Sequence, residues 1–534
     1  MIKSIVDIVN INTYVSLLRS KLGLLGYPQL SPVREGVIQN MRFVFIFLSC
    51  STILFAAASA RAEPVGLDTV IRNVLERHPD VSLSRLQPQF ADADAQGIAG
   101  QLDPALSATV SVSDEQTPFV SQFAPVSAKR RQFIGTISKP LASGDTVTLN
   151  MDYNRRKLDF NSPFAAQLAN PNPAYRSQIN LSVRHPLLRG AGRPAYNKAL
   201  EASHADKEAA LMQVRTTEEQ LALQALQLYY GIASDTENVK LADEAVSRAK
   251  RVLADQRRRE RLGLVEVADR LQAGALLATR RMNSRQARAT LARDIAALNR
   301  LMLRDPDTPL SVLTKEPVPS DTPDFEEAIR RAQIYRPEIK NLEAKLQAAE
   351  SRLTEARDKE RMQLDVVAKL GSRALNGLSG TAFKQGFSIS DRFASLDLEF
   401  SDTLGRRSAR SGIRRAALDR EQVLLEHRQA LERIKDDISR TLTTFTTERR
   451  TWHAAKIRVK AEKLMFEAER RRYREGRSST ANLIQFEGEL LTAEVDASRS
   501  HILLLLAYRQ MQWAEGLLLQ TLHIVPVTSN KTQQ

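Results

Sequence analysis

Two kinds of hydrophobic pattern alternate along the chain, and each occurs in both halves. Residues 195–305 contain no proline, and apolar side chains such as Leu221, Leu228 and Ile232 recur there at helical spacing. Residues 412–519 repeat this pattern. A helix over 197–260 would be about 95 Å long at about 1.5 Å per residue. Because no globular core supports a helix of that length, the pattern predicts helices that pack against partner helices along their length.

Shorter segments alternate strictly between apolar and polar residues, which is the signal of a half-buried strand. They precede the long helical region in each half, and they cover residues 105–115, 131–140, 145–155 and 176–186, then 363–371 and 392–401. The stretch PLASGDT predicts a tight turn between the middle pair of the first half. The other segments between strands are rich in Gly, Pro, Ser and Asn, and they predict long loops.

Matching motifs indicate that the two halves are a tandem duplication. RLGLVEVADRLQ at 261–272 and REGRSSTANLIQ at 474–485 share their glycine and a Gln nine residues later, and they lie 213 residues apart (476 − 263). His78-Pro79 likewise corresponds to Arg336-Pro337, where proline should end one helix and begin the next. The predicted organisation is a first repeat, a proline-rich linker, a second repeat and a disordered tail, at 63–305, 306–323, 324–522 and 523–534.

The N-terminal region predicts export. Residues 43–58 are apolar, follow Met41-Arg42 and precede small residues at Ala60 and Ala62, which is the pattern of a secretory signal peptide over 41–62. Residues 1–40 form an extension before it, and Met41 offers an alternative start of translation. Cys50 is the single cysteine, so a chain cleaved after Ala62 can contain neither a disulfide nor a cysteine zinc site.

The basic charge does not indicate nucleic-acid binding. The formal charge is +15, of which residues 1–62 contribute +4, leaving +11 (15 − 4). The basic residues are spread along helices opposite acids, which is typical of solvated helix faces. The seven histidines show no metal-ligand spacing, and the nucleophile, phosphate-loop and zinc-protease motifs are absent from the sequence. We therefore expect neither an enzyme nor a cofactor.

The strand segments have the length of membrane-spanning strands, about 9–11 residues. A sheet in hydrocarbon must close on itself, and the smallest single-chain barrels use about eight strands. One copy offers four to six, so several chains would have to pool their strands. The long helices of the same chains would then meet as a tube.

The order of these motifs resembles the outer-membrane efflux proteins, the TolC-like channels, over about residues 65–522. The residues that carry the resemblance are the two Pro-containing helix starts, QLYYGIASD at 227–235, LSVRHPLLRG at 181–190, and the paired glycine turns. The resemblance implies a mainly α fold with a β-barrel portion. A tandem-repeat α-barrel tunnel would continue a transmembrane β-barrel shared by a homotrimer, with four strands per chain and twelve in all. The first half departs from this pattern with four segments in place of two: either the extra pair is a hairpin outside the barrel, or one strand is longer and bent.

The resemblance also implies a location and partners. The chain would be the outer-membrane exit duct of a tripartite efflux pump or a type I secretion system, in contact with outer-membrane lipid. A periplasmic adaptor and an inner-membrane pump, either ABC-type or proton-driven, would complete the assembly, without nucleic acid. The adaptor would dock at the periplasmic tip formed by Leu262, Gly263, Leu264, Glu475, Gly476 and Arg477.

The family's gate maps onto residues close to this tip. Asp269 and Tyr473 fall on two positions of its polar network, and Ser478 occupies the position of an arginine. The acidic constriction of the family falls on Asn482 and Gln485, both neutral here. We therefore expect a constriction that is less cation-selective than an acidic ring.

The same sequence features leave one alternative, a periplasmic coiled-coil adaptor or scaffold that never enters a membrane. It accounts for the long helices and the export signal. It leaves the alternating strands between the helices unexplained.

Overall fold

The computed structural model describes residues 64–118, 120–313, 323–388 and 391–524. The predicted extension and the signal peptide lie outside these residues. Among the helices that the structure describes, none combines the length and hydrophobicity that a membrane crossing requires.

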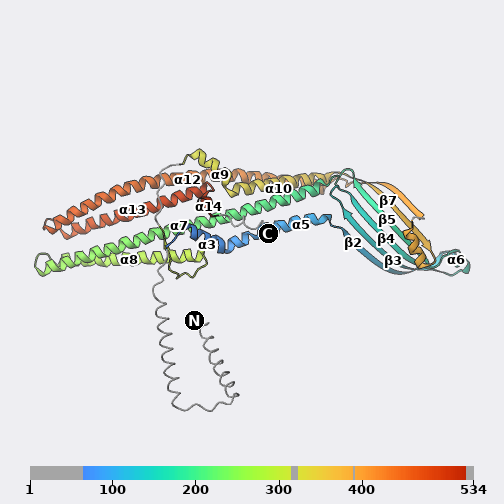
Figure 1. Cartoon of the computed structure of the whole chain (residues 1–534), viewed down its shortest axis with the longest axis horizontal. Coiled ribbons are helices and arrows are strands. Elements are labelled where there is room, and N and C mark those ends of the chain that lie inside the picture. The colour runs from blue at the N-terminus through green and yellow to red at the C-terminus, as the bar shows by residue number, and fades with distance from the viewer. Residues whose placement is uncertain (1–63, 119, 314–322, 389–390, 525–534) are drawn as a thin grey trace, which may run out of the picture. The chain divides into compact units, whose positions relative to one another are not determined.

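The first repeat runs from short helices through four strands into a long helical hairpin (Figure 1). Its helices before the sheet are α3 (Leu67–Arg77), α4 (Pro79–Ser84) and α5 (Leu86–Ala99). Its strands are β2 (Ala105–Gln116), β3 (Pro125–Pro140), β4 (Thr146–Phe160) and β5 (Ala174–Pro186), with the short helix α6 (Pro163–Leu168) before β5. The hairpin consists of α7 (Pro194–Arg261) and α8 (Val267–Leu301).

The second repeat follows the same plan with two strands. Its elements are α9 (Phe325–Tyr335), α10 (Pro337–Glu360), β7 (Gln363–Asn376), α11 (Ser379–Phe387), β8 (Arg392–Ser401), α12 (Arg407–Arg474), α13 (Thr480–Ala514) and α14 (Leu518–Thr521). Within the predicted linker, β6 (Ser311–Val312) pairs in parallel with β1 (Pro64–Val65). The predicted tail from 523 begins too early, because Ile524 is buried against the helical core.

The helical hairpins of the two repeats match residue by residue. α7 and α12 each have 68 residues, and α8 and α13 each have 35. Adding 213 to a residue number of the first hairpin gives its equivalent in the second. Left-handed backbone recurs at the same offset in four pairs, which are Gly192/Gly405, Arg193/Arg406, Gly263/Gly476 and Leu303/Gly516. The duplication predicted from the glycine turns therefore extends over the whole hairpin.

The extra length of the first repeat is a single insertion. Before the sheet, equivalent residues such as His78 and Arg336 differ by 258. After it the offset is 213, so the first repeat holds 45 additional residues (258 − 213). They fall between β2 and β5, where the chain forms the β3–β4 hairpin. The second repeat has only α11 in the corresponding place, between β7 and β8.

The six strands other than β1 and β6 form one antiparallel sheet in the order β2-β3-β4-β5-β7-β8. This corrects the expected four strands per chain, because the inserted hairpin lies inside the sheet and pairs with β2 on one side and β5 on the other. β3 and β4 also reach beyond the predicted 131–155, to Pro125 and Phe160. The alternation was hidden there by consecutive basic residues at 129–131 and 155–157.

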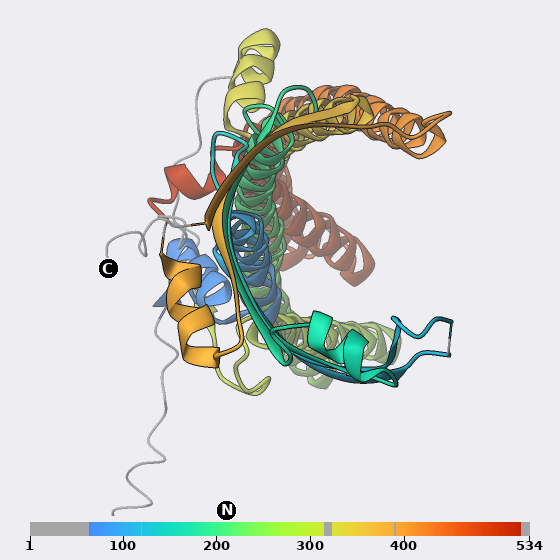
Figure 2. The same cartoon turned by 90° about the vertical axis from the view of Figure 1, so that its right-hand side faces the viewer.

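The sheet has one apolar face that is continuous across all six strands. The register places Val110, Phe133 and Tyr153 in one row, and Leu106, Ile137, Leu149, Leu181, Leu370 and Ala394 in another. The opposite face carries Ser, Thr, Asn and Gln, including a 2.8 Å hydrogen bond from Asn150 to Thr136. The sheet is curved, and α11 packs on its convex side (Figure 2). Because α11 contacts Tyr153 through Ser379 and Phe383, the apolar face is the convex one.

The tight turn of the inserted hairpin is held against the exit from β5. Leu141 donates a 2.8 Å hydrogen bond to the carbonyl of Asp145, which confirms the predicted turn. The carbonyl of Ser143 accepts from the backbone of Gly192, and Asp145 lies 2.6 Å from His185 Nδ1. Gly144 has φ +103°, and a Cβ there would lie 2.6 Å from the backbone oxygen of Gly190. The hairpin is therefore fixed to the same corner from which α7 begins.

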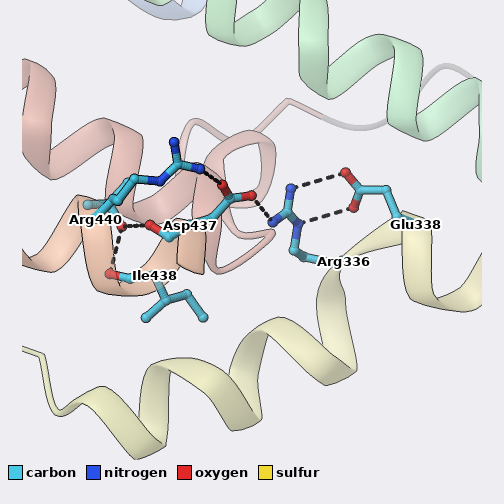
Figure 3. Close-up of polar contacts among 6 residues, drawn as sticks. Arg336, Glu338, Asp437, Ile438 and Arg440 are labelled. Carbon is cyan, nitrogen blue, oxygen red and sulfur yellow. Dashed lines mark hydrogen bonds and ion pairs between the residues drawn. The ribbon is translucent and has the colours of Figure 1, made fainter. Parts of the chain in front are cut away.

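The core lies midway along the helices, where α3 and α9 pack against the long hairpins. At the start of α10, Arg336 is 3% exposed and makes two hydrogen bonds of 3.1 Å to Glu338 and one of 3.0 Å to Asp437 on α12 (Figure 3). Its guanidinium also stacks 4.7 Å from the ring of Trp513 on α13. Because removing one partner of a buried ion pair is costly, this arginine ties α10 to the second hairpin.

Candidate functional site

The predicted tips are the turns that join the long helices, at the end of the helices remote from the sheet (Figure 1). At the first tip, Gly263 has φ +69° and donates to the carbonyl of Glu260, while Leu264 donates to Arg259, both at 2.9 Å. At the second tip, Gly476 has φ +73°, and the two equivalent hydrogen bonds are 3.1 and 2.8 Å. This is the Schellman arrangement, in which a left-handed residue satisfies the last carbonyls of a helix. Glycine adopts that conformation without steric cost.

The two tips share a backbone but differ in surface chemistry. Leu262 and Leu264 are 67% and 69% exposed. At the second tip Glu475 and Arg477 form an ion pair with each other. The first tip is therefore apolar and the second charged.

Arginines surround both tips. They are Arg257, Arg258, Arg259 and Arg261 at the end of α7, and Arg470, Arg471, Arg472 and Arg474 at the end of α12. Cations are favourable at helix C-termini because the helix dipole is negative there. Some are paired locally, as Arg259 is with Asp255 at 2.9 Å. Most of them are exposed, so the tip region presents positive charge to solvent.

Tyr473 joins the two helical hairpins just behind the tips. Its hydroxyl accepts a hydrogen bond from Gln256 on α7, and Gln256 also donates to Thr480 on α13 at 2.8 Å. Tyr473, Gln256 and Thr480 are all buried. The guanidinium of Arg259 lies 4.5 Å from the Tyr473 ring, a cation–π contact.

The other predicted gate residues lie around this buried cluster. Ser478 donates to Glu469 of α12. Asp269 lies in the first turn of α8 and is half-buried, and among the described residues no hydrogen bond joins it to Tyr473. The structure therefore brings Tyr473 together with Gln256 and Thr480, which the sequence reasoning missed. The 213-residue offset could have drawn attention to Gln256, because its equivalent is Glu469, the partner of Ser478.

Asn482 and Gln485 lie one turn apart on α13, and both are exposed. Gln485 donates to Glu489 at 2.9 Å. Deeper between the hairpins, Glu487 is 2% exposed and bridges Arg248 and Arg280 at 3.2 and 2.6 Å. A buried carboxylate with two guanidinium partners holds α7, α8 and α13 together. The helix that carries Asn482 and Gln485 is therefore fixed in place close to these residues. Within the described ranges no cluster of His, Cys, Asp or Glu has the arrangement of a metal site.

Comparison with solved structures shows the fold. The chain superposes on the outer-membrane channel OprN with a TM-score of 0.61 at 18% identity, covering 84% of this chain and 89% of that one. It superposes on the CmeC outer-membrane channel of Campylobacter jejuni with a TM-score of 0.58 at 16% identity, covering 85% and 86%. The chain has the outer-membrane channel fold. The predicted TolC-like fold of long helical hairpins with a β-sheet is thereby confirmed.

The channel fold is shared despite low sequence similarity. The outer-membrane protein VceC of Vibrio cholerae superposes with a TM-score of 0.57 at 14% identity, covering 85% of this chain and 95% of that one. No protein-family model matches the sequence, and no curated protein sequence is significantly similar to it. The likeness therefore lies in how the helices and strands are arranged.

Proposed function

We propose that the chain is the outer-membrane exit duct of a tripartite efflux pump or a type I secretion system in a Gram-negative bacterium. One observation carries this proposal, which is a sheet with a continuous apolar convex face at the end of long helical hairpins. Each of its strands has at least the 10 residues of β8, and a tilted membrane-spanning strand needs about 9–11. A periplasmic adaptor or scaffold would expose this apolar face to water, and soluble proteins rarely expose a patch of that size.

The edges of the sheet support assembly with further copies. Within the described residues β2 and β8 pair on one side only, and Leu106 on β2 and Leu396 on β8 are 77% and 75% exposed. An open edge cannot lie in hydrocarbon. Since the six strands alternate in direction, β8 of one copy would meet β2 of the next in an antiparallel pair. Such head-to-tail contacts form a ring when the rotation from one copy to the next closes, as the curvature of the sheet favours.

Three copies, the number that the TolC-like resemblance implies, would give 18 strands (3 × 6). Barrels of about 16–18 strands leave an aqueous channel. The polar concave face would line this channel. The long helices of the three copies would extend it into the periplasm.

The tips would dock the periplasmic adaptor of an inner-membrane pump. The exposed Leu262 and Leu264 offer an apolar contact at one tip, and Glu475 and Arg477 a charged one at the other. The surrounding arginines favour an acidic partner surface, so docking should weaken as salt increases. Tyr473 and Gln256 would hold the neighbouring hairpins together while the tunnel is closed, with Asn482 and Gln485 forming its narrowest ring.

Purification of the exported chain tests the duct. We expect it in the outer-membrane fraction, soluble only with detergent, and of threefold mass by light scattering. A monomer that is soluble without detergent would refute the proposal and would favour the adaptor or scaffold.

A further inference from the structure

The inserted hairpin carries basic side chains that face one another across two strands. The register places Lys129 opposite Lys157, Arg130 opposite Arg156, and Arg131 opposite Arg155. Like charges directly opposite in a sheet are destabilising. Three consecutive pairs of like charge are therefore tolerated only where anions lie close to them.

The alternation of the strands divides these residues between the two faces. Arg131 and Arg155 lie on the convex apolar face with Phe133 and Tyr153, two positions away along each strand. Lys129 and Lys157 share that face. Arg130 and Arg156 lie on the polar concave face.

The convex group lies one membrane-spanning length from the helical end of the sheet. β3 ends at Pro140 beside the helices, so nine residues (132–140) separate Arg131 from that end. Phe133 lies one row nearer the helices on the same face and is exposed, whereas Tyr153 in that row lies against α11 through Ser379 and Phe383. Aromatic residues mark the membrane interface in barrels. In the proposed orientation Arg131 and Arg155 would therefore lie at the level of the lipid head groups of the outer leaflet. Tyr175 lies beside Arg155 in the same row.

The local acids pair with the two lysines of this group but not with its two arginines. Lys129 lies 3.6 Å from Asp114, and Lys157 lies 3.3 Å from Asp159. No acidic partner for Arg131 or Arg155 lies within ion-pair distance among the residues described. Directly opposed side chains have Cβ atoms about 4.5–5.5 Å apart, so both guanidinium groups can reach one phosphate. Arginine binds phosphate through two parallel hydrogen bonds, which suits it to this task.

We propose that Arg131 and Arg155, flanked by Lys129 and Lys157, bind a phosphate of the outer-leaflet lipid of the outer membrane. This inference rests on the proposed function, because it requires the convex face to contact lipid. In Gram-negative bacteria the lipid of that leaflet is phosphorylated lipid A. Its phosphates would supply the negative charge that the hairpin lacks, and they would fix the depth of the sheet in the membrane.

The concave pair provides a matched control for the test. R131Q/R155Q and R130Q/R156Q remove the same charge from the same two strands at neighbouring register positions, on opposite faces. Trimers of each variant and of the wild type are purified in detergent, and the bound lipid A is measured by native mass spectrometry. Rebinding is then measured in nanodiscs with lipid A and with dephosphorylated lipid A.

We expect wild type and R130Q/R156Q to retain equal amounts of lipid A, and R131Q/R155Q to retain at least fivefold less. Dephosphorylated lipid A should bind the wild type and R130Q/R156Q as weakly as it binds R131Q/R155Q. Equal retention by all three proteins, equal loss from both variants, or undiminished binding of the dephosphorylated lipid would each overturn the inference. If R131Q/R155Q does not assemble, R131Q compared with R130Q gives the same test.

Failure of the inference can be distinguished from failure of the proposed function. A wild-type chain that forms no membrane-embedded trimer refutes the duct itself. Normal trimers whose lipid A content is insensitive to Arg131 and Arg155 refute only the phosphate site.

Discussion

Removal of the inserted hairpin should narrow the barrel by one third. Deleting residues 117–161 removes 45 residues, which is the excess of the first repeat over the second (258 − 213). β2 and β5 would then be connected by residues 162–173, and they could pair directly. The first repeat would have two strands, as the second does.

The expected diameters follow from the strand count. With strands about 4.8 Å apart and tilted by about 40°, 18 strands give a barrel about 36 Å across between backbones. Twelve strands give about 24 Å at the same spacing and tilt. The cross-section would therefore fall by a factor of about two.

Electron cryomicroscopy of detergent-solubilised trimers measures this directly. We expect an 18-stranded barrel for the wild type and a 12-stranded barrel for the deletion variant. The long helices should be unchanged beyond the start of α7, because the insertion lies between β2 and β5 and touches the helical part only through its turn at 141–145. A wild-type barrel about 24 Å across, with β3 and β4 projecting from it, would show that the insertion lies outside the barrel. This outcome does not depend on whether the variant folds.

Three further outcomes are expected. Valine at Gly263 or Gly476 should abolish adaptor docking and export while trimers remain intact. A side chain at positive φ costs about 1–2 kcal/mol and distorts the tip. Co-purification with the adaptor measures docking. Since Asn482 and Gln485 are neutral, a trivalent cation added at the periplasmic side of a planar bilayer should cause no strong block, and strong block would contradict the assignment. Burial raises the pKa of Glu219 to about 8, so Glu219→Gln should raise the unfolding temperature at pH 8 and leave it nearly unchanged at pH 4.

The sign of the pH effect follows from proton linkage. The unfolded chain loses the Glu219 proton above its ordinary pKa of 4.5, whereas the folded chain keeps it until about pH 8. Folding therefore becomes less favourable as pH rises through this window, by an amount on the order of a few kcal/mol at most. Glutamine has no proton to lose, and an equal shift at both pH values would contradict this account.

For the tip variants, Gly274→Val is the control, because that glycine has ordinary backbone and open space around an added Cβ.

The helical part of the fold could be predicted from the sequence because its signals are local and repeated. The absence of proline, the apolar stripe and the two glycine turns determine where the hairpins of α7/α8 and α12/α13 begin and bend. The turn at Gly144 was also predictable, because its neighbours Ser143 and Asp145 are typical turn residues. Each of these features depends on residues close together in the chain.

The strand count and the buried contacts behind the tips depend on residues far apart in the chain. Alternation identified all six strands, but whether β3 and β4 lie inside the sheet depends on pairing with β2 and β5. The hydrogen bond between Gln256 and Tyr473 joins residues 217 positions apart. Neither side chain stands out locally, so only the three-dimensional arrangement brings them together.

Because the insertion lies in the sheet of a single repeat, the sheet and the helical tips can change independently of each other in evolution. Residues 192–304 keep an exact numerical correspondence with 405–517, whereas all 45 additional residues lie between β2 and β5 and meet the helical part only where the turn at 141–145 contacts the exit from β5. The barrel could thus be widened in evolution without a change in the tips that would contact the adaptor. Selection on what leaves the cell and selection on what drives it would then act on different stretches of the same gene.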